Sequence, residues 1–164
     1  RDKARQAQCI NNTRQIASGI LQYAMEPSKR LRFPDEAGSD IKIGGATNRP
    51  LSDIIRDAKV FECPMDRLGR FKSNGNSYLY PLTRDNKANI DAVGGKKITD
   101  FTSPSKKVLV YEPPLQMTSV EIKADPRYKW HHANNPASVI GFLDGHSEFV
   151  STNATTLSEN NPYY

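Results

Sequence analysis

Residues 1–25 read RDKARQAQCINNTRQIASGILQYAM, and this stretch decides the fold that we expect. Apolar and small residues recur in it at steps of three and four, the period of one face of an α-helix; they are Ile10, Thr13, Ile16, Ala17, Ile20 and Ala24. The helix should end at Glu26-Pro27, because a proline disfavours helical geometry in the residue before it. The sequence therefore predicts a long N-terminal helix with one buried face, already regular at its first residue.

Composition favours one domain, residues 1–164, built around one modest core. The chain is 37% hydrophobic, and its eleven prolines and ten glycines predict long loops. It has no apolar run long enough to span a membrane. The net charge of +5 is spread in short basic groups with acidic residues between most of them, and no nucleic-acid-binding motif accompanies them. We therefore expect a solvated basic surface and no nucleic-acid partner.

A β-hairpin is the clearest strand signal. Residues 138–150 read SVIGFLDGHSEFV, and Asp144-Gly145 suits a two-residue type I′ turn. In that register Ile140 pairs with Phe149, and Ile140, Phe142 and Phe149 share the face that packs on the helix. With an apolar strand at 106–111, this predicts an α+β fold with a small antiparallel sheet. We also predict a short helix at 50–57, an extended piece at 60–63 and a short strand at 78–80.

The polar side chains near the hairpin that we consider for a site are His131, His132, Asp144 and His146. Two imidazoles and a carboxylate can bind zinc when they converge, and a chain that folds back would bring His132 near the turn. The alternative, which we adopt, is that Asp144 serves the turn and the histidines bond loop carbonyls. On that interpretation we expect no metal and no cofactor. We expect no hydrolase either, because no activated nucleophile or Gly-rich phosphate loop accompanies these residues. Further acids, too scattered to assign to a site, are Glu112, Asp125 and Glu148.

The two cysteines lie far apart, Cys9 in the predicted helix and Cys63 in Val-Phe-Glu-Cys-Pro. Without nearby histidines they do not make a zinc site, which leaves two buried thiols or one disulfide. A disulfide would indicate an oxidising compartment. The residues alone leave both alternatives open.

Several short motifs follow one another along nearly the whole chain: Lys3-Ala4-Arg5, Cys9, Asn11-Asn12, Gln15-Ile16, Tyr23, Phe33-Pro34, Phe61-x-Cys63-Pro64, Ser77-Tyr78, residues 104–108 and Phe142-x-Asp144-Gly145-His146. In this order they resemble the prepilin-type proteins abundant in Planctomycetes, Lentisphaerae and Verrucomicrobia. That family in turn resembles the major pseudopilin of type II secretion systems. His132 lies farther from Asp144-Gly145 than the family's histidine does, and residues 151–164 lack the acidic loop with which major pseudopilins hold calcium.

The resemblance implies a type IV pilin-like fold, in which the second half of a long N-terminal helix packs on the sheet. It implies a segment before Arg1 that carries a short basic leader and a membrane-spanning helix, cleaved and N-methylated by a leader peptidase. It also implies a disulfide between Cys9 and Cys63, since the domain would lie outside the cytoplasm. The protein would be anchored in the inner membrane with this domain in the periplasm, or would form a filament at the cell surface.

We therefore expect a structural, non-enzymatic subunit of a type II secretion-like or type IV pilus-like filament. Its partners would be other copies, the secretion machinery and the membrane. One alternative is a membrane-tethered binding module for a glycan or protein, with an exposed aromatic patch drawn from Tyr128, Trp130, Tyr163 and Tyr164. A second alternative is a metal-dependent enzyme at His132, Asp144 and His146.

Overall fold

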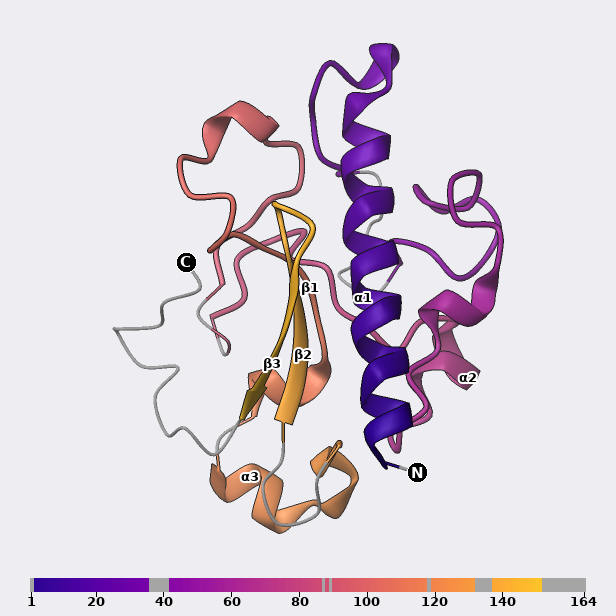
Figure 1. Ribbon diagram of the computed structural model, residues 1–164, viewed down its shortest axis with the longest axis vertical. Helices are drawn as coiled ribbons and strands as arrows, with labels where there is room; N and C mark the ends of the chain where they lie inside the picture. The colour runs from indigo at the N-terminus through magenta and orange to yellow at the C-terminus, as the bar shows by residue number, and fades with distance from the viewer. Residues whose placement is uncertain are drawn as a thin grey trace.

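One long helix lies beside a three-stranded sheet in the computed structural model (Figure 1), which describes residues 2–35, 42–86, 88, 90–117, 119–131 and 137–151. The helices are α1 (Asp2–Met25), α2 (Arg70–Asn74) and α3 (Ser119–Ala124), and the strands are β1 (Val108–Tyr111), β2 (Ala137–Phe142) and β3 (Ser147–Ser151). Short 3-10 turns occur at Pro27–Lys29, Ala58–Phe61, Ile98–Asp100, Pro113–Gln116 and Pro126–Tyr128. The predicted α+β class is confirmed.

The predicted N-terminal helix is also confirmed. It ends at Met25, and Pro27 opens the 3-10 turn that follows. The buried residues of α1 recur with the expected period: Cys9, Asn12, Thr13, Ile16, Ala17, Gly19, Ile20, Tyr23 and Ala24. The helix contacts all three strands, most extensively β2. Within the described residues, no helix is long and apolar enough to cross a membrane.

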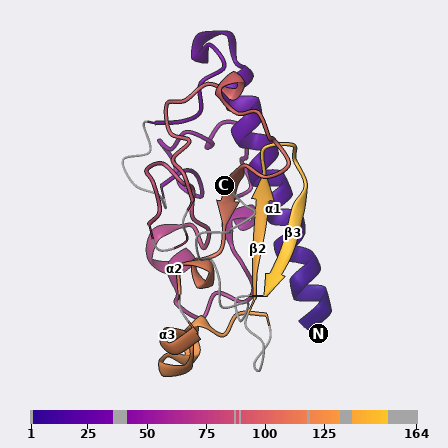
Figure 2. The ribbon, with the colours of Figure 1, turned by 90° about the vertical axis from the view of Figure 1, so that its left-hand side faces the viewer.

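The sheet is antiparallel in the order β1-β2-β3, so that β2 is its central strand. All six residues of β2 are buried, whereas β3 at the sheet's edge is only partly buried. One face of the sheet packs on α1, as the two views show (Figures 1 and 2). Its other face carries a smaller apolar cluster that includes Ile140, Phe142 and Tyr111.

The predicted hairpin forms, but its predicted turn and register are wrong. Gly145 has φ of +87° and Asp144 does not have a positive φ, so the two positive-φ positions of a type I′ turn are not both present. The amide of Gly145 donates to the carbonyl of Phe142 and the amide of Phe142 donates to the carbonyl of His146, which makes a three-residue loop. Phe149 consequently pairs with Val139 instead of Ile140.

The predicted helix-facing side of β2 is wrong as well. Val139 and Leu143 belong to the core shared with α1, while Ile140 and Phe142 lie in the cluster on the far face, and Phe149 is 42% exposed. Both faces of β2 are buried, so its sequence lacks the polar alternation that would have identified the helix-facing side. Gly141 also faces the helix: a Cβ there would lie 2.7 Å from Val110 Cγ1 and 3.1 Å from the carbonyl oxygen of Thr13.

The smaller predictions had mixed outcomes. Residues 51–54 form turns where a short helix was predicted, and Ala58–Phe61 is a 3-10 turn where an extended piece was predicted. The predicted strand at 78–80 is reduced to one antiparallel bridge between Leu79 and Tyr111. The strand predicted at 106–111 is present as β1.

Candidate functional site

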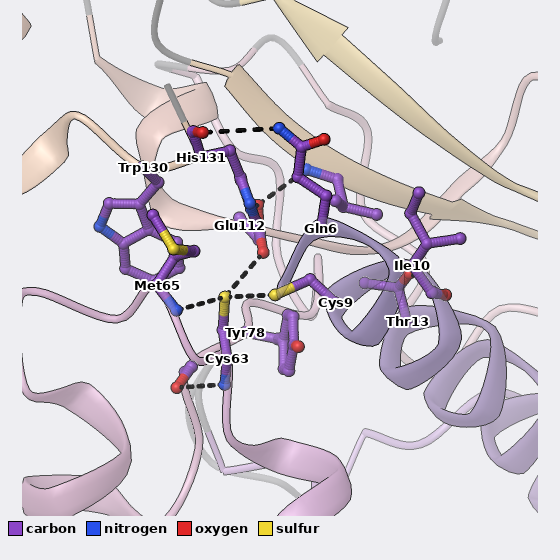
Figure 3. Close-up of polar contacts among 12 residues, drawn as sticks. Gln6, Cys9, Ile10, Thr13, Cys63, Met65, Tyr78, Glu112, Trp130 and His131 are labelled. Atoms are coloured by element: carbon purple, nitrogen blue, oxygen red, sulfur yellow. Dashed lines mark hydrogen bonds and ion pairs between the residues drawn. The ribbon is translucent and has the colours of Figure 1, made fainter. Parts of the chain in front are cut away.

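Four side chains that can bind metal ions meet in the interior between α1 and the sheet (Figure 3); we call them the buried cluster, and they are Cys9, Cys63, Glu112 and His131. Each comes from a different part of the chain. Cys9 lies on α1, Cys63 follows the 3-10 turn Ala58–Phe61, Glu112 follows β1 directly, and His131 lies shortly before β2. Their exposed fractions are only 0–2%.

The four side chains form a continuous chain of polar contacts. The two sulfur atoms are 2.7 Å apart, and the Cys63 thiol donates to Glu112 Oε1 at 3.2 Å. His131 Nε2 lies 2.7 Å from Glu112 Oε2. One potential ligand atom from each residue lies within 4.8 Å of the other three. The cluster is therefore compact enough for all four donors to contact one ion.

A serine hydroxyl and a backbone amide hold Cys63 in place. Its own amide donates to Ser77 Oγ at 3.1 Å, and the amide of Met65 donates to its sulfur at 3.4 Å. Burial raises the pKa of the Cys63 thiol well above its ordinary value, and the contact with Cys9 and the charge of Glu112 raise it further. Cys63 is therefore a thiol at neutral pH.

Glu112 and His131 are fixed from the sheet and from α1. Glu112 Oε2 accepts a hydrogen bond from the amide of Val139 on β2 at 2.8 Å. His131 has φ of +63°, a left-handed conformation that a non-glycine residue seldom adopts. Its carbonyl accepts from Gln6 Nε2 at 3.5 Å, and its ring stands edge-on to Phe149 with centroids 5.4 Å apart. Among the described residues, His131 Nδ1 has no hydrogen-bond partner.

A polar pair next to the cluster links α1 to the loops. Asn12 Nδ2 donates to the carbonyl of Glu62 at 2.9 Å and to the hydroxyl of Tyr78 at 3.2 Å. Tyr78 is fully buried. Burial raises its pKa well above the ordinary value, and the nearby thiols and carboxylate add to this, so its hydroxyl remains protonated.

The predicted metal candidates do not form this site. Asp144 and His146 contact each other at the hairpin turn, where His146 Nε2 also lies 3.3 Å from Glu148 and its ring stacks on Phe142. Burial tends to raise the pKa of Asp144, but its hydrogen bonds with His146 outweigh this and lower it. Asp144 also accepts a hydrogen bond from the amide of His146 at 3.1 Å, in agreement with its predicted role in the turn. The predicted bonds from the histidines to loop carbonyls are wrong, because the rings of His131 and His146 contact carboxylates. His132 lies outside the described residues.

The cysteines do lie together, as a disulfide between them would require, but the structure has both as free, buried thiols. The disulfide itself stays a prediction. The expectation that the cysteines lack a histidine neighbour is wrong, because the fold brings His131 next to them through Glu112. The sequence carried two signals for this. Glu112 is an acid placed directly after the apolar strand Val108–Tyr111, and His131 follows the chain's single tryptophan, which is fully buried.

No family model matches the chain, and no curated protein or solved structure shows a significant match to it.

The chemistry open to the buried cluster follows from its donors and its burial. Two sulfurs, an imidazole and a carboxylate suit zinc-like ions better than calcium or magnesium, which prefer oxygen. A substrate could not reach the four side chains without opening the core, since they are at most 2% exposed. The arrangement therefore favours a structural role over catalysis.

Proposed function

We propose that this domain is the head of a pilin-like structural subunit, which assembles through its N-terminal helix into a type II secretion-like or type IV pilus-like filament. One observation carries the proposal. From Cys9 to Ala24, α1 buries a continuous face against the body, whereas residues 2–8 are exposed apart from the half-buried Gln6. The first two turns stand clear of the sheet (Figure 2).

This division suits a helix with two tasks. Residues 9–24 fix the head, and residues 2–8 are free to contact membrane lipids or neighbouring subunits. Lys3 and Arg5 are exposed in that first segment, where they could face lipid head groups or an acidic surface. The membrane-spanning segment and the processed leader that the family resemblance implies would precede α1. The head would then lie in the periplasm or on the outside of a filament.

The two other candidate functions have less support. The binding-module alternative needs exposed aromatic residues, but Trp130 is fully buried and Tyr128 is half-buried, while Tyr163 and Tyr164 lie outside the described residues. The enzyme alternative needs His132, Asp144 and His146 to meet at one point, and His132 lies outside the described residues. Among the described residues, the metal-binding side chains that converge are those of the buried cluster. We propose no catalytic role for the domain.

Cross-linking in the native host tests assembly. Intact cells that produce the native protein are treated with a lysine-reactive cross-linker, and the products are detected with an antibody to the domain. We expect a ladder at multiples of the subunit mass, weakened by Lys3→Glu combined with Arg5→Glu, since reversing both charges disturbs the exposed residues 2–8 of α1. Lys72→Glu is the matched control, because Lys72 is an exposed cation that belongs to α2 and not to α1. A purely monomeric pattern at native expression would refute assembly.

A further inference from the structure

We infer that the buried cluster is a binding site for one divalent cation of the zinc class. The inference does not depend on the proposed function, because a head domain could be fastened by metal whether or not it assembles. It starts from the convergence of four donors within 4.8 Å of one another, drawn from four separate stretches of the chain.

The donor set points to zinc. Thiolates and imidazole are preferred ligands of zinc-like ions, and a carboxylate oxygen can complete the coordination. Four protein donors fill a tetrahedral shell, which is typical of closed, structural zinc sites and leaves no position for a substrate. Calcium and magnesium are disfavoured, because both need several oxygen ligands and the cluster has one carboxylate.

The geometry needs only a modest expansion. Zinc–sulfur bonds of about 2.3 Å in a tetrahedron place two sulfurs about 3.8 Å apart. The sulfurs of Cys9 and Cys63 are 2.7 Å apart, so they would separate by about 1 Å. The 3.2 Å between Cys63 Sγ and Glu112 Oε1 would lengthen less. Side-chain rotation suffices for movements of this size.

Backbone donors already support two of the ligands. The amide of Met65 points at Cys63 Sγ, and the amide of Val139 donates to Glu112 Oε2. Ligands of metal sites are commonly oriented by hydrogen bonds of this kind, which fix their direction and share their negative charge. The same bonds would persist with metal present, because both donors are backbone amides of residues outside the cluster.

A cation also explains what a disulfide leaves unexplained. A disulfide would use Cys9 and Cys63 only, and Glu112 with His131 would remain a polar pair in the core. A disulfide would also remove the thiol hydrogen that Glu112 Oε1 accepts, leaving the carboxylate with His131 and the Val139 amide, and a buried carboxylate is costly when its charge is less compensated. One dication contacting all four residues accounts for the burial of every member. It would displace the thiol protons, because cysteine binds metal as thiolate.

Such a site would fasten four segments at one point: α1, the loop at Cys63, the end of β1 and the segment before β2. Since the described residues between 26 and 107 have little regular secondary structure, a metal at this point would hold those loops to the helix. We therefore expect a higher melting temperature with zinc bound than after chelation.

The first test uses untagged protein purified without added metal or reductant. Elemental analysis gives the metal content, and intact mass after denaturation gives the thiol state. About one zinc per chain with two free thiols supports the inference. A metal-free chain whose mass is two hydrogen atoms below that of the chain with two thiols contains a disulfide, and this result overturns the inference.

A metal-free chain with two free thiols is decided by titration with Co²⁺. One equivalent that produces thiolate-to-cobalt charge-transfer absorption supports the site, and no such absorption overturns it. X-ray absorption on the loaded wild type should show two sulfurs at about 2.3 Å and two lighter ligands at about 2.0–2.1 Å. This readout needs no variant and therefore survives any folding defect.

Matched variants assign the ligands. Glu112→Gln and His131→Gln should each lower Co²⁺ affinity by about tenfold or more. Glu148→Gln and His146→Gln are the controls, since both residues lie at the hairpin outside the cluster, and they should leave the affinity unchanged. Binding that is equally strong in all four variants would overturn the assignment.

Discussion

Gly141→Ala should separate β2 from α1 and destabilise the fold. The new Cβ would lie 2.7 Å from Val110 Cγ1, 3.1 Å from the Thr13 carbonyl oxygen and 3.5 Å from Ala17 Cβ. Contacts of Cβ atoms in proteins are longer than 2.7 Å, so either the Val110 side chain or the backbone of β2 must move. Val110 is fully buried and its β-branched side chain has little rotamer freedom, while the Thr13 carbonyl belongs to the helix backbone.

Overpacking of this kind costs about 1–3 kcal/mol. In a chain of this length, each kcal/mol lowers the melting temperature by about 2–4 °C. The assay is urea denaturation followed by circular dichroism, with thiol and metal conditions held the same for every variant. Wild-type stability for Gly141→Ala would refute the close approach of β2 to α1.

A double-mutant cycle with Val110→Ala makes the test specific. Val110→Ala alone should cost about 1–3 kcal/mol, because it leaves a cavity. In the Gly141→Ala background it removes the methyl group that clashes, so the double variant should be more stable than the sum of the single effects predicts, by about 0.5 kcal/mol or more. Additive effects would mean that the two side chains do not meet across the β1–β2 pairing.

Three further predictions concern single polar or aromatic side chains. Asn12→Ala should lower the free energy of unfolding by about 1–3 kcal/mol, because it leaves the Glu62 carbonyl and the Tyr78 hydroxyl without the hydrogen bonds that Asn12 donates. Asn11→Ala, on the exposed side of the same helix, should change it by no more than about 0.5 kcal/mol. Equal effects of the two variants in urea denaturation would contradict this prediction. Burial lowers the pKa of Lys107 from 10.5 to about 8, so between these pH values the unfolded chain binds a proton that the folded chain lacks. The free energy of unfolding of the wild type should therefore rise with pH in this range, relative to that of Lys107→Met. The same pH dependence of stability in both proteins would contradict this prediction. Trp130, the single tryptophan, is fully buried, so its fluorescence should resist acrylamide quenching until the chain unfolds, and strong quenching of the native protein would place it at the surface.

The helix could be predicted from the sequence because its signals are local. A 3.6-residue period needs only neighbouring residues, and Pro27 marks the end. The hairpin was predictable from Asp144-Gly145 for the same reason. The loop length was not, because a glycine after an aspartate also suits a three-residue loop with only Gly145 at positive φ.

The orientation of β2 depended on information that the strand does not carry. All six residues of β2 are buried, including Ser138, its one polar residue. A shift of one position therefore exchanges two buried faces, and no polar alternation along the strand distinguishes them. What decides the orientation is Gly141, whose missing side chain lets α1 approach. A glycine within an apolar strand indicates a close backbone approach, and this signal was available.

The site was predictable only in part. The resemblance paired Cys9 with Cys63, and the fold does place them together. Glu112 lies 49 residues after Cys63 in sequence, and His131 lies farther still. Tertiary packing brings both next to the cysteines, and no rule based on sequence spacing predicts such a contact. Asp144 and His146 attracted attention because they are close in sequence, and the turn accounts for both.

The central claim, a pilin-like subunit anchored through its N-terminal helix, is tested most directly by mass spectrometry of the N-terminus of the native protein taken from its own membranes. The account predicts an N-methylated first residue followed by an uninterrupted hydrophobic segment that leads into α1. An unmodified N-terminus generated at a conventional signal-peptide cleavage site would contradict it.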